Sequence, residues 1–286
     1  MINCNECLML DEKVVAKVLP TPEECVQWVV DILTRKSECI LPPKISLHFA
    51  ECNFFNTMPS QIPWIDRMGV KAIIRVIGRK PTVQGDLMLY EMSSGKLLSI
   101  MDATLITQWR TGAVAAHSLN IFGKKNGVLA MLGLGATART TLKSFLAAYP
   151  SNRPVQIKLL RYKDQAERFI EEFDKERLDF KIIDSIPDLI RDSDSIVSCV
   201  TAFDGPIADD SLFKSGCTVI PVHTRGFQNC DLFFDKVFAD DRGTVCHFGN
   251  FDKFRYFGEV ASVLSGGGTD LISRTNSCLQ YWIKLA

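Results

Sequence analysis

Residues 133–138 carry the pattern in this sequence that most clearly indicates chemistry. They read G-L-G-A-T-A, which fits G-x-G-x-x-A. Gly133 would permit a tight turn, Gly135 would let a pyrophosphate approach the backbone, and the small Ala138 would let helix and strand pack closely. A short apolar strand precedes the turn, and the helix after it offers free N–H groups to phosphates. We therefore predict a dinucleotide site that includes Ala136 and Thr137; the alternative is a glycine turn without a nucleotide.

Two cations follow the next apolar strand and bear on which nucleotide binds. The sequence there is Leu159-Leu160-Arg161-Tyr162-Lys163. Sites for NAD usually have an acid at this point that holds the ribose 2′-hydroxyl, whereas a basic residue suits a 2′-phosphate. The acid is absent and two cations are near, so the sequence favours NADP(H) over NAD(H). The alternative is that Arg161 and Lys163 are ordinary solvated loop charges.

Arg110 stands where an arginine is not expected. In LITQWRTGAVAAHS, Thr107 would be a good N-cap, which puts Arg110 at the third helical position, where a capping box has Glu or Gln. A cation there is disfavoured by the helix dipole by roughly 0.3–1 kcal/mol. A binding role would explain it, because a helix start and an arginine together suit an anion such as a carboxylate. The small residues of 112–116 would let the helix pack closely where two domains meet.

Length and charge restrict the classes of protein. A chain of 286 residues is comfortable for two domains, and 33 basic against 33 acidic residues give no broad electrostatic case for nucleic acid or an anionic membrane. No apolar run reaches the ~18 residues needed to span a bilayer. The first residues have acids after a short apolar stretch and no basic segment, which is a poor signal peptide. We expect a soluble, cytoplasmic protein that binds neither nucleic acid nor membrane.

The ten cysteines are scattered, and several lie in apolar runs, where a cytosolic chain uses cysteine as a small buried hydrophobe. Cys4 and Cys7 form one C-x-x-C, but a tetrahedral zinc site needs two more ligands at suitable spacing. The four histidines form no recognisable metal pair. We therefore expect no metal site.

Two successive rhythms of elements would position these residues. Residues 21–36 read as an amphipathic helix, and KISLHF, GVKAIIRVIG, GDLMLYEM and LLSIMDA follow as candidate strands, the last two flanking an SSGK turn. From about residue 127, strands alternate with helices: GVLAML, the helix that Pro150 stops, VQIKLL, a helix capped by Asp164, and then FKIID, SIVSCV, CTVIPV and KVFAD. This alternation predicts an α/β fold with a Rossmann-type doubly wound parallel sheet, beside an α+β domain.

GKLLSIMDATLITQWRTGAVAAHSL, followed after a short gap by LGLGATA, resembles the ornithine cyclodeaminase/μ-crystallin family. The hallmark of that family is a T-G…D-A…T-x-x-R-T-A-A-like segment just before its Rossmann domain. MPS at residues 58–60, GVKAI, PTVQG at residues 81–85 and FGEVASVLSGG also match, so the resemblance covers essentially the whole chain in order.

The resemblance implies a homodimer. Residues 1–120, completed by residues 265–286, would bind substrate and form the dimer, and residues 121–264 would bind NAD(P). Family chemistry is hydride exchange at the α-carbon of an amino or imino acid. The terminal RTNSCLQYWIKLA resembles the start of the family's last helix, with Trp282 and Lys284 where a small polar residue and a glycine are usual.

The family pattern also implies roles for single residues. On the substrate side, Lys44 stands where an arginine usually holds the carboxylate, Met58 lies in the matching MPS segment, and Lys71 matches the lysine near the reacting carbon. A lysine partly buried beside an imine shares its proton more readily than a surface lysine. The alternatives are that Lys71 is an exposed strand charge and that Lys44 does not bind the carboxylate, since a lysine lacks arginine's fork geometry.

Arg110 and Thr111 match the pair that faces the carboxylate and the nicotinamide. Thr82 matches a cofactor-contacting threonine, and Thr201 lies at the end of the fourth strand, where the family contacts the nucleotide.

One departure decides between activities. Cyclodeaminases of the family have an aspartate after the fifth strand, and the corresponding position here is Thr224, with Cys230 in place of a later acid and Asp231 shifted by one. Without that carboxylate, we favour a ketimine reductase or amino-acid dehydrogenase, with Thr224 at the catalytic position. Two alternatives stay open: an ornithine cyclodeaminase that makes proline and ammonia, and a non-catalytic NADPH-dependent binding protein.

Overall fold

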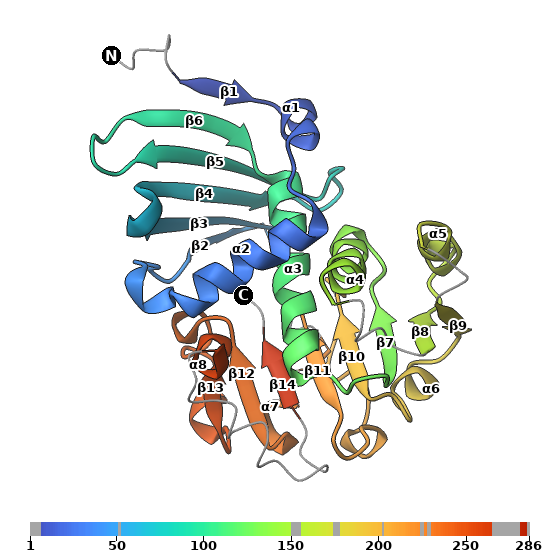
Figure 1. Ribbon diagram of the computed structural model, residues 1–286. Coiled ribbons are helices and arrows are strands. Elements are labelled where there is room, and N and C mark those ends of the chain that lie inside the picture. The colour runs from blue at the N-terminus through green and yellow to red at the C-terminus, as the bar shows by residue number, and fades with distance from the viewer. Residues whose placement is uncertain are drawn as a thin grey trace. The chain divides into compact units, whose positions relative to one another are not determined.

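The computed structural model describes residues 7–50, 53–149, 156–173, 178–201, 203–223, 226–227, 230–264 and 281–284 (Figure 1). The chain divides into two compact units. The first comprises residues 1–21 and 35–108, and the second comprises residues 22–34 and 109–286. The predicted domain boundary at residue 120 falls near the end of helix α3 (Thr104–Phe122), whereas the two units divide within that helix.

The first unit is built on one six-stranded sheet. Its order is β1-β6-β5-β4-β3-β2, antiparallel from β2 to β6, with β1 parallel to β6. The strands are β1 (Leu8–Leu10), β2 (Ile45–Phe49), β3 (Asn53–Ile62), β4 (Arg67–Arg75), β5 (Val83–Glu91) and β6 (Leu97–Asp102), and helix α1 is Glu12–Lys17. The four predicted strands are confirmed as β2, β4, β5 and β6. Strand β3 was not predicted, because its polar residues and Pro59 hide the alternation that identifies a strand.

The second unit contains an eight-stranded sheet in which every pair is parallel. Its order is β13-β12-β14-β11-β10-β7-β8-β9. The strands are β7 (Val128–Leu132), β8 (Gln156–Leu160), β9 (Asp179–Ile183), β10 (Ser195–Ser198), β11 (Thr218–Pro221), β12 (Lys236–Ala239), β13 (Phe257–Glu259) and β14 (Tyr281–Lys284). Within this sheet the chain runs from β7 through β8 to β9 at one edge and then returns to β10 on the other side of β7, so the direction of strand addition reverses beside β7. This confirms the predicted doubly wound fold.

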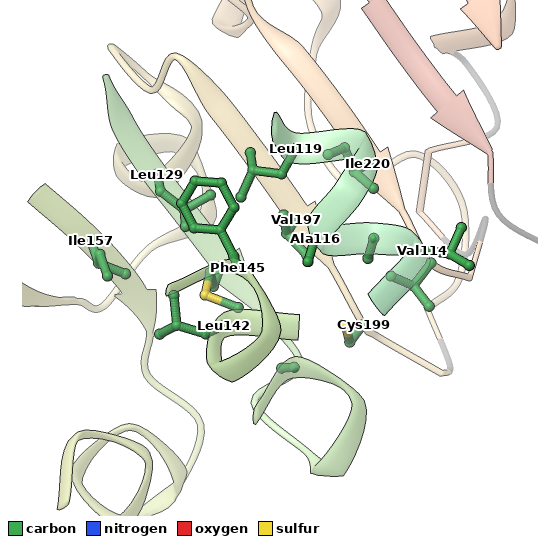
Figure 2. Close-up of a cluster of buried hydrophobic side chains, with 14 of the residues drawn as sticks. Val114, Ala116, Leu119, Leu129, Leu142, Phe145, Ile157, Val197, Cys199 and Ile220 are labelled. Atoms are coloured by element: carbon green, nitrogen blue, oxygen red, sulfur yellow. The ribbon is translucent and has the colours of Figure 1, made fainter. Parts of the chain in front are cut away.

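Helices cover both faces of this sheet. They are α2 (Pro22–Thr34), the second part of α3, α4 (Ala136–Ala148), α5 (Gln165–Glu171), α6 (Ile186–Ile190), α7 (Cys230–Phe233) and α8 (Val260–Leu264). Along β7, Leu129 and Met131 belong to one buried cluster, and Ala130 and Leu132 belong to another. Side chains of a strand alternate between faces, so β7 is apolar on both. Figure 2 shows the first cluster, in which Phe145 of α4 lies beside Leu129.

Helix α3 begins one turn earlier than the sequence predicts. The Asp102 carboxylate accepts the backbone N–H of Thr104 at 2.8 Å, and the helix runs from Thr104. The prediction of Thr107 as N-cap is therefore wrong, because an ionised acceptor lies nearby at the strand end. Arg110 consequently lies in the second turn. The dipole effect falls off within the first turn, so the expected penalty on its charge is largely absent.

The small residues after Arg110 pack within the second unit. Ala113, Ala115 and Ala116 are fully buried there. A Cβ added to Gly112 would lie 2.4 Å from the Thr140 hydroxyl and 2.7 Å from the α4 backbone. Only glycine permits this approach of α3 to α4.

Two further predictions concern element ends, and one of them is wrong. Asp164 is the N-cap residue of α5, as predicted, but its side chain makes no capping hydrogen bond and pairs instead with Arg168 at 2.5 Å. Residues 281–284 were expected to start a helix, but they form β14 between β11 and β12. Tyr, Trp and Ile favour strands, and the neighbouring strands β11 and β12 provide hydrogen-bond partners on both sides. The rest of residues 265–286 lies outside the described residues, so the proposed completion of the first domain stays a prediction.

Candidate active site

The glycine turn has the geometry that a dinucleotide requires. Gly133 has φ +74°, and a Cβ there would lie 2.6 Å from the backbone atoms of Cys199 and Val200. Gly135 is the N-cap of α4, and a Cβ there would meet no atom within 4 Å. The first glycine thus fits β7 closely against the end of β10, and the second leaves open space above the helix start. That space and the α4 amides suit a pyrophosphate.

Arg139 links this turn to helix α5. Its guanidinium donates to the Leu134 carbonyl inside the turn and to the carboxylate of Glu172, and it lies 5.5 Å from the Phe169 ring centroid. Ala138 is 1% exposed and belongs to the buried cluster under the helix. The turn is therefore tied to α5 as well as to the sheet, which holds its amides in fixed directions.

A cleft of about 480 Å³ opens above the turn, at the carboxyl ends of β7, β8, β10 and β11. Its volume is typical of small-molecule sites, and its place beside β7 is where doubly wound sheets bind ligands. The predicted residues that line it are Gly133, Gly135, Ala136, Thr137 and Thr201. The residues that the sequence interpretation did not assign to the site are Leu160, Tyr162, Gln165, Cys199, Val200 and His223. Most of them follow the carboxyl end of a parallel strand, where open α/β sheets bind ligands, so their positions after predicted strands could have identified them.

Arg161 and Lys163 do not line the cleft. The Arg161 Nε donates to Asp184 at 2.6 Å, and its Nη1 donates to Glu167. These two hydrogen bonds raise the pKa of Arg161 above its ordinary value. Lys163 has φ +53°, and its Nζ lies 5.4 Å from the Tyr162 ring centroid.

A cysteine and a histidine, Cys199 and His223, line the strand ends of the cleft. Burial raises the pKa of the Cys199 thiol to about 12, so this cysteine is a neutral hydrophobe at physiological pH. His223 follows β11 and is exposed at the cleft. Thr224, the predicted catalytic position beside it, lies outside the described residues, and of Cys230 only the place at the start of α7 is described.

In the first unit, the sheet register brings two predicted substrate residues together. Met58 of β3 lies directly opposite Lys71 of β4, so both side chains are on one face of the sheet. Ile45, the first paired residue of β2, lies opposite Thr57, and Lys44 immediately precedes it. Lys44 is exposed, and Met58 and Lys71 are half-buried. Met58 and Lys71 therefore form a cross-strand pair, and Lys44 stands at the start of the neighbouring strand β2.

Thr82 lies apart from this pair, just before β5. It is exposed, and its hydroxyl donates to the Arg79 carbonyl at 3.2 Å.

Arg110 and Thr111 lie on α3 in the second unit, and both are half-buried. Burial lowers the pKa of Arg110, and the negative charge of Asp240, at the end of β12, opposes that effect. An arginine stays protonated at any physiological pH, so Arg110 presents a partly desolvated cation with a carboxylate in its field.

The described residues contain no group of three or more His, Cys, Asp or Glu side chains that could hold a metal. Among the same residues, no helix is long and apolar enough to cross a membrane.

The model of the ornithine cyclodeaminase/mu-crystallin family matches residues 6–236. The Δ1-pyrroline-2-carboxylate reductase of Paracoccus denitrificans is 27% identical over 170 residues, which is 57% of this chain and 53% of that protein. The alignments to three such relatives span 73%, 48% and 53% of the relatives' own lengths.

Two solved structures share the fold. The Thermococcus litoralis Δ1-pyrroline-2-carboxylate reductase, in complex with NADH and L-proline, is similar with a TM-score of 0.82 at 18% identity, over 98% of this chain and 92% of that one. An archaeal alanine dehydrogenase dimer with bound NAD has the same TM-score and identity, over 98% and 90%. The glycine turn, the strand order and the match over residues 6–236 agree: this chain belongs to the ornithine cyclodeaminase/mu-crystallin family.

Proposed function

We propose that the protein is an NAD(P)-dependent oxidoreductase that transfers hydride at the α-carbon of a small imino or amino acid, of the ketimine reductase or amino-acid dehydrogenase type. The observation that carries this proposal is the glycine turn, with its φ of +74° at Gly133 and open space at Gly135, at the mouth of the cleft. The reductase and dehydrogenase names of similar proteins support the same class.

The nicotinamide supplies a hydride to the imine carbon when it is bound. The α4 amides and the loop at Thr201 would hold the nucleotide, with Thr82 and Thr111 as further contacts. Arg110 would hold the substrate carboxylate, because a half-buried guanidinium offers two parallel donors at little solvation cost. Lys44 would add a second positive charge to that carboxylate.

Lys71 would orient the imine and deliver the proton that its nitrogen needs as the carbon takes the hydride. The sheet register supports this role, because it places Lys71 directly opposite Met58, another predicted substrate residue. Thr224 would stand at the position that distinguishes reductases from cyclodeaminases.

For the cofactor, our preference is NADP(H), with NAD(H) as the alternative, because two cations follow β8, although one of them, Arg161, also holds two carboxylates. We also propose a cytoplasmic homodimer. The alanine dehydrogenase relative is a dimer, and Ile45, Leu47 and Phe49 on the edge strand β2 are 61%, 60% and 43% exposed, which is an apolar row suited to burial by a second copy.

A cofactor-oxidation screen tests the function. NADPH or NADH is mixed with cyclic imines, and with 2-keto acids plus amines, and the loss of reduced cofactor is followed with wild type and Arg110→Ala. We expect turnover with at least one imine and a fall in kcat/KM of about a hundredfold or more in the variant, from two charge-assisted hydrogen bonds. Full activity of the variant would exclude the carboxylate role. Proline and ammonia from ornithine without net oxidation would establish a cyclodeaminase, and tight binding without turnover would establish a binding protein.

A further inference from the structure

Arg161 is held between two carboxylates that come from different elements. Asp184 follows β9 and accepts from the Arg161 Nε at 2.6 Å, and Glu167 in the first turn of α5 accepts from Nη1. The Arg161 backbone N–H donates to the Ile183 carbonyl at 2.9 Å, which fixes the arginine beside the end of β9. The guanidinium therefore has a defined place and two defined partners.

This cluster borders the cleft without lining it. Leu160 and Tyr162, on either side of Arg161, both line the cleft, together with Gln165. The end of the second strand of a doubly wound sheet is where the 2′ substituent of the adenosine ribose is read. Arg161 thus stands at the discriminating position, with its side chain directed to acids.

The charges at this strand end cancel. Arg161 and Lys163 contribute two positive charges, and Glu167 and Asp184 contribute two negative charges within hydrogen-bond reach of the arginine. Asp164 is already neutralised by Arg168 at 2.5 Å. A 2′-phosphate carries a charge of about −2, like a phosphorylated side chain, and must displace a carboxylate to occupy the guanidinium fork. A 2′-hydroxyl needs no such exchange.

We propose that Glu167 and Asp184 set the cofactor preference of this protein by competing with the 2′-phosphate of NADP(H) for Arg161. The proposal rests on the proposed function only in that a nicotinamide dinucleotide binds in the cleft. In wild type, the competition lowers the affinity for NADPH relative to a protein in which Arg161 has no carboxylate partner. The side chains are 44–77% exposed, so solvent screens each pair, and removal of one carboxylate is worth about a three- to fivefold change in affinity.

The test measures binding, independent of turnover. Dissociation constants for NADPH and NADH are measured by isothermal titration calorimetry for wild type, Glu167→Gln, Asp184→Asn and the double variant. We expect the NADPH affinity to rise about three- to fivefold in each single variant and about tenfold in the double variant, with the NADH affinity unchanged within twofold. The matched control is Asp179→Asn, which makes the same charge change at the exposed opposite end of β9 and should leave the ratio unchanged.

Arg161→Ala, made in wild type and in the double variant, tests whether the two carboxylates act through Arg161. It should reduce NADPH affinity by at most threefold in wild type but by tenfold or more in the double variant, where the guanidinium is released. Nucleotide binding with the same NADPH-to-NADH ratio in every variant would overturn this proposal and leave the proposed function intact. Binding of neither nucleotide by any folded variant, with folding checked by circular dichroism, would overturn both.

Discussion

Alanine substitutions at the two glycines of the turn should separate folding from cofactor binding. Gly133→Ala places a side chain on a residue with φ +74°, and its Cβ would lie 2.6 Å from the backbone of Cys199 and Val200. Gly135→Ala places the same methyl group at φ −82°, with no atom within 4 Å. The first methyl collides with the protein, whereas the second occupies the space that we assign to the pyrophosphate.

The magnitudes follow from these contacts. A left-handed conformation costs a non-glycine residue about 1–2 kcal/mol. Moving the β10 end by the several tenths of an ångström needed to relieve the contact adds about 1–3 kcal/mol, as in overpacked cores. We therefore expect Gly133→Ala to lose about 2–5 kcal/mol of unfolding free energy. Gly135→Ala should lose about 1 kcal/mol or less, because alanine is merely a poorer N-cap, but its methyl should weaken NAD(P)H binding by about tenfold or more.

Urea unfolding and nucleotide titration of both variants measure the two effects. Gly205→Ala is the matched stability control, because Gly205 also has positive φ, +72°, but a Cβ there would meet nothing within 4 Å. Its loss should equal the left-handed cost alone, about 1–2 kcal/mol. A Gly133→Ala protein no less stable than Gly205→Ala would refute the contact, and wild-type nucleotide affinity in Gly135→Ala would refute the pyrophosphate position.

Three other predictions concern buried or reactive groups. Burial raises the pKa of Asp194, but bonds from Lys214 (2.5 Å), the Val128 N–H (2.8 Å) and Lys124 (3.2 Å) outweigh it and hold the pKa below its usual range. The stability that this carboxylate contributes is thus present above its unfolded pKa of about 3.9 and is lost as pH falls through the lower folded pKa. In urea unfolding at neutral pH, Asp194→Asn should lose about 2–4 kcal/mol of unfolding free energy, and its unfolding free energy should fall less on acidification than that of wild type. An equal fall in the two proteins would contradict this prediction. Burial lowers the pKa of His117, whose Nδ1 lies 2.7 Å from the Tyr149 hydroxyl, to about 4. Below pH ~6.5 the unfolded chain binds a proton that the folded protein does not bind, so the unfolding free energy should fall by about 3 kcal/mol between pH ~6.5 and pH ~4. Calorimetric melting should show a smaller change of unfolding free energy with pH over this window in His117→Gln. Lys71→Gln should lower kcat by about 10²–10⁴-fold with unchanged nucleotide affinity, since a positioned proton donor is lost, whereas an equal loss of cofactor binding would argue for a structural role.

The glycine turn could be predicted from sequence because its requirements are local. A positive φ at Gly133, an open helix start at Gly135 and a small residue at position 138 depend on neighbours a few residues away. The parallel sheet could be predicted as well, since strands buried on both faces, such as Val128–Leu132, appear as continuous apolar runs. The start of α3 was mispredicted because the sequence offers two capping side chains, Asp102 and Thr107. The charged carboxylate of Asp102 accepts the backbone N–H of Thr104, so the helix begins there.

By itself, then, the sequence determined the fold class, the family and the nucleotide turn, because each depends on short segments whose physics is contained in them. Tertiary structure alone decided which distant residues meet. The register across β3 and β4 places Met58 opposite Lys71, although no local pattern identifies β3 as a strand. The return of the chain through β9 brings Asp184 to Arg161, which are separated by 23 residues in sequence. Charge at a binding position is therefore set by partners that only folding supplies.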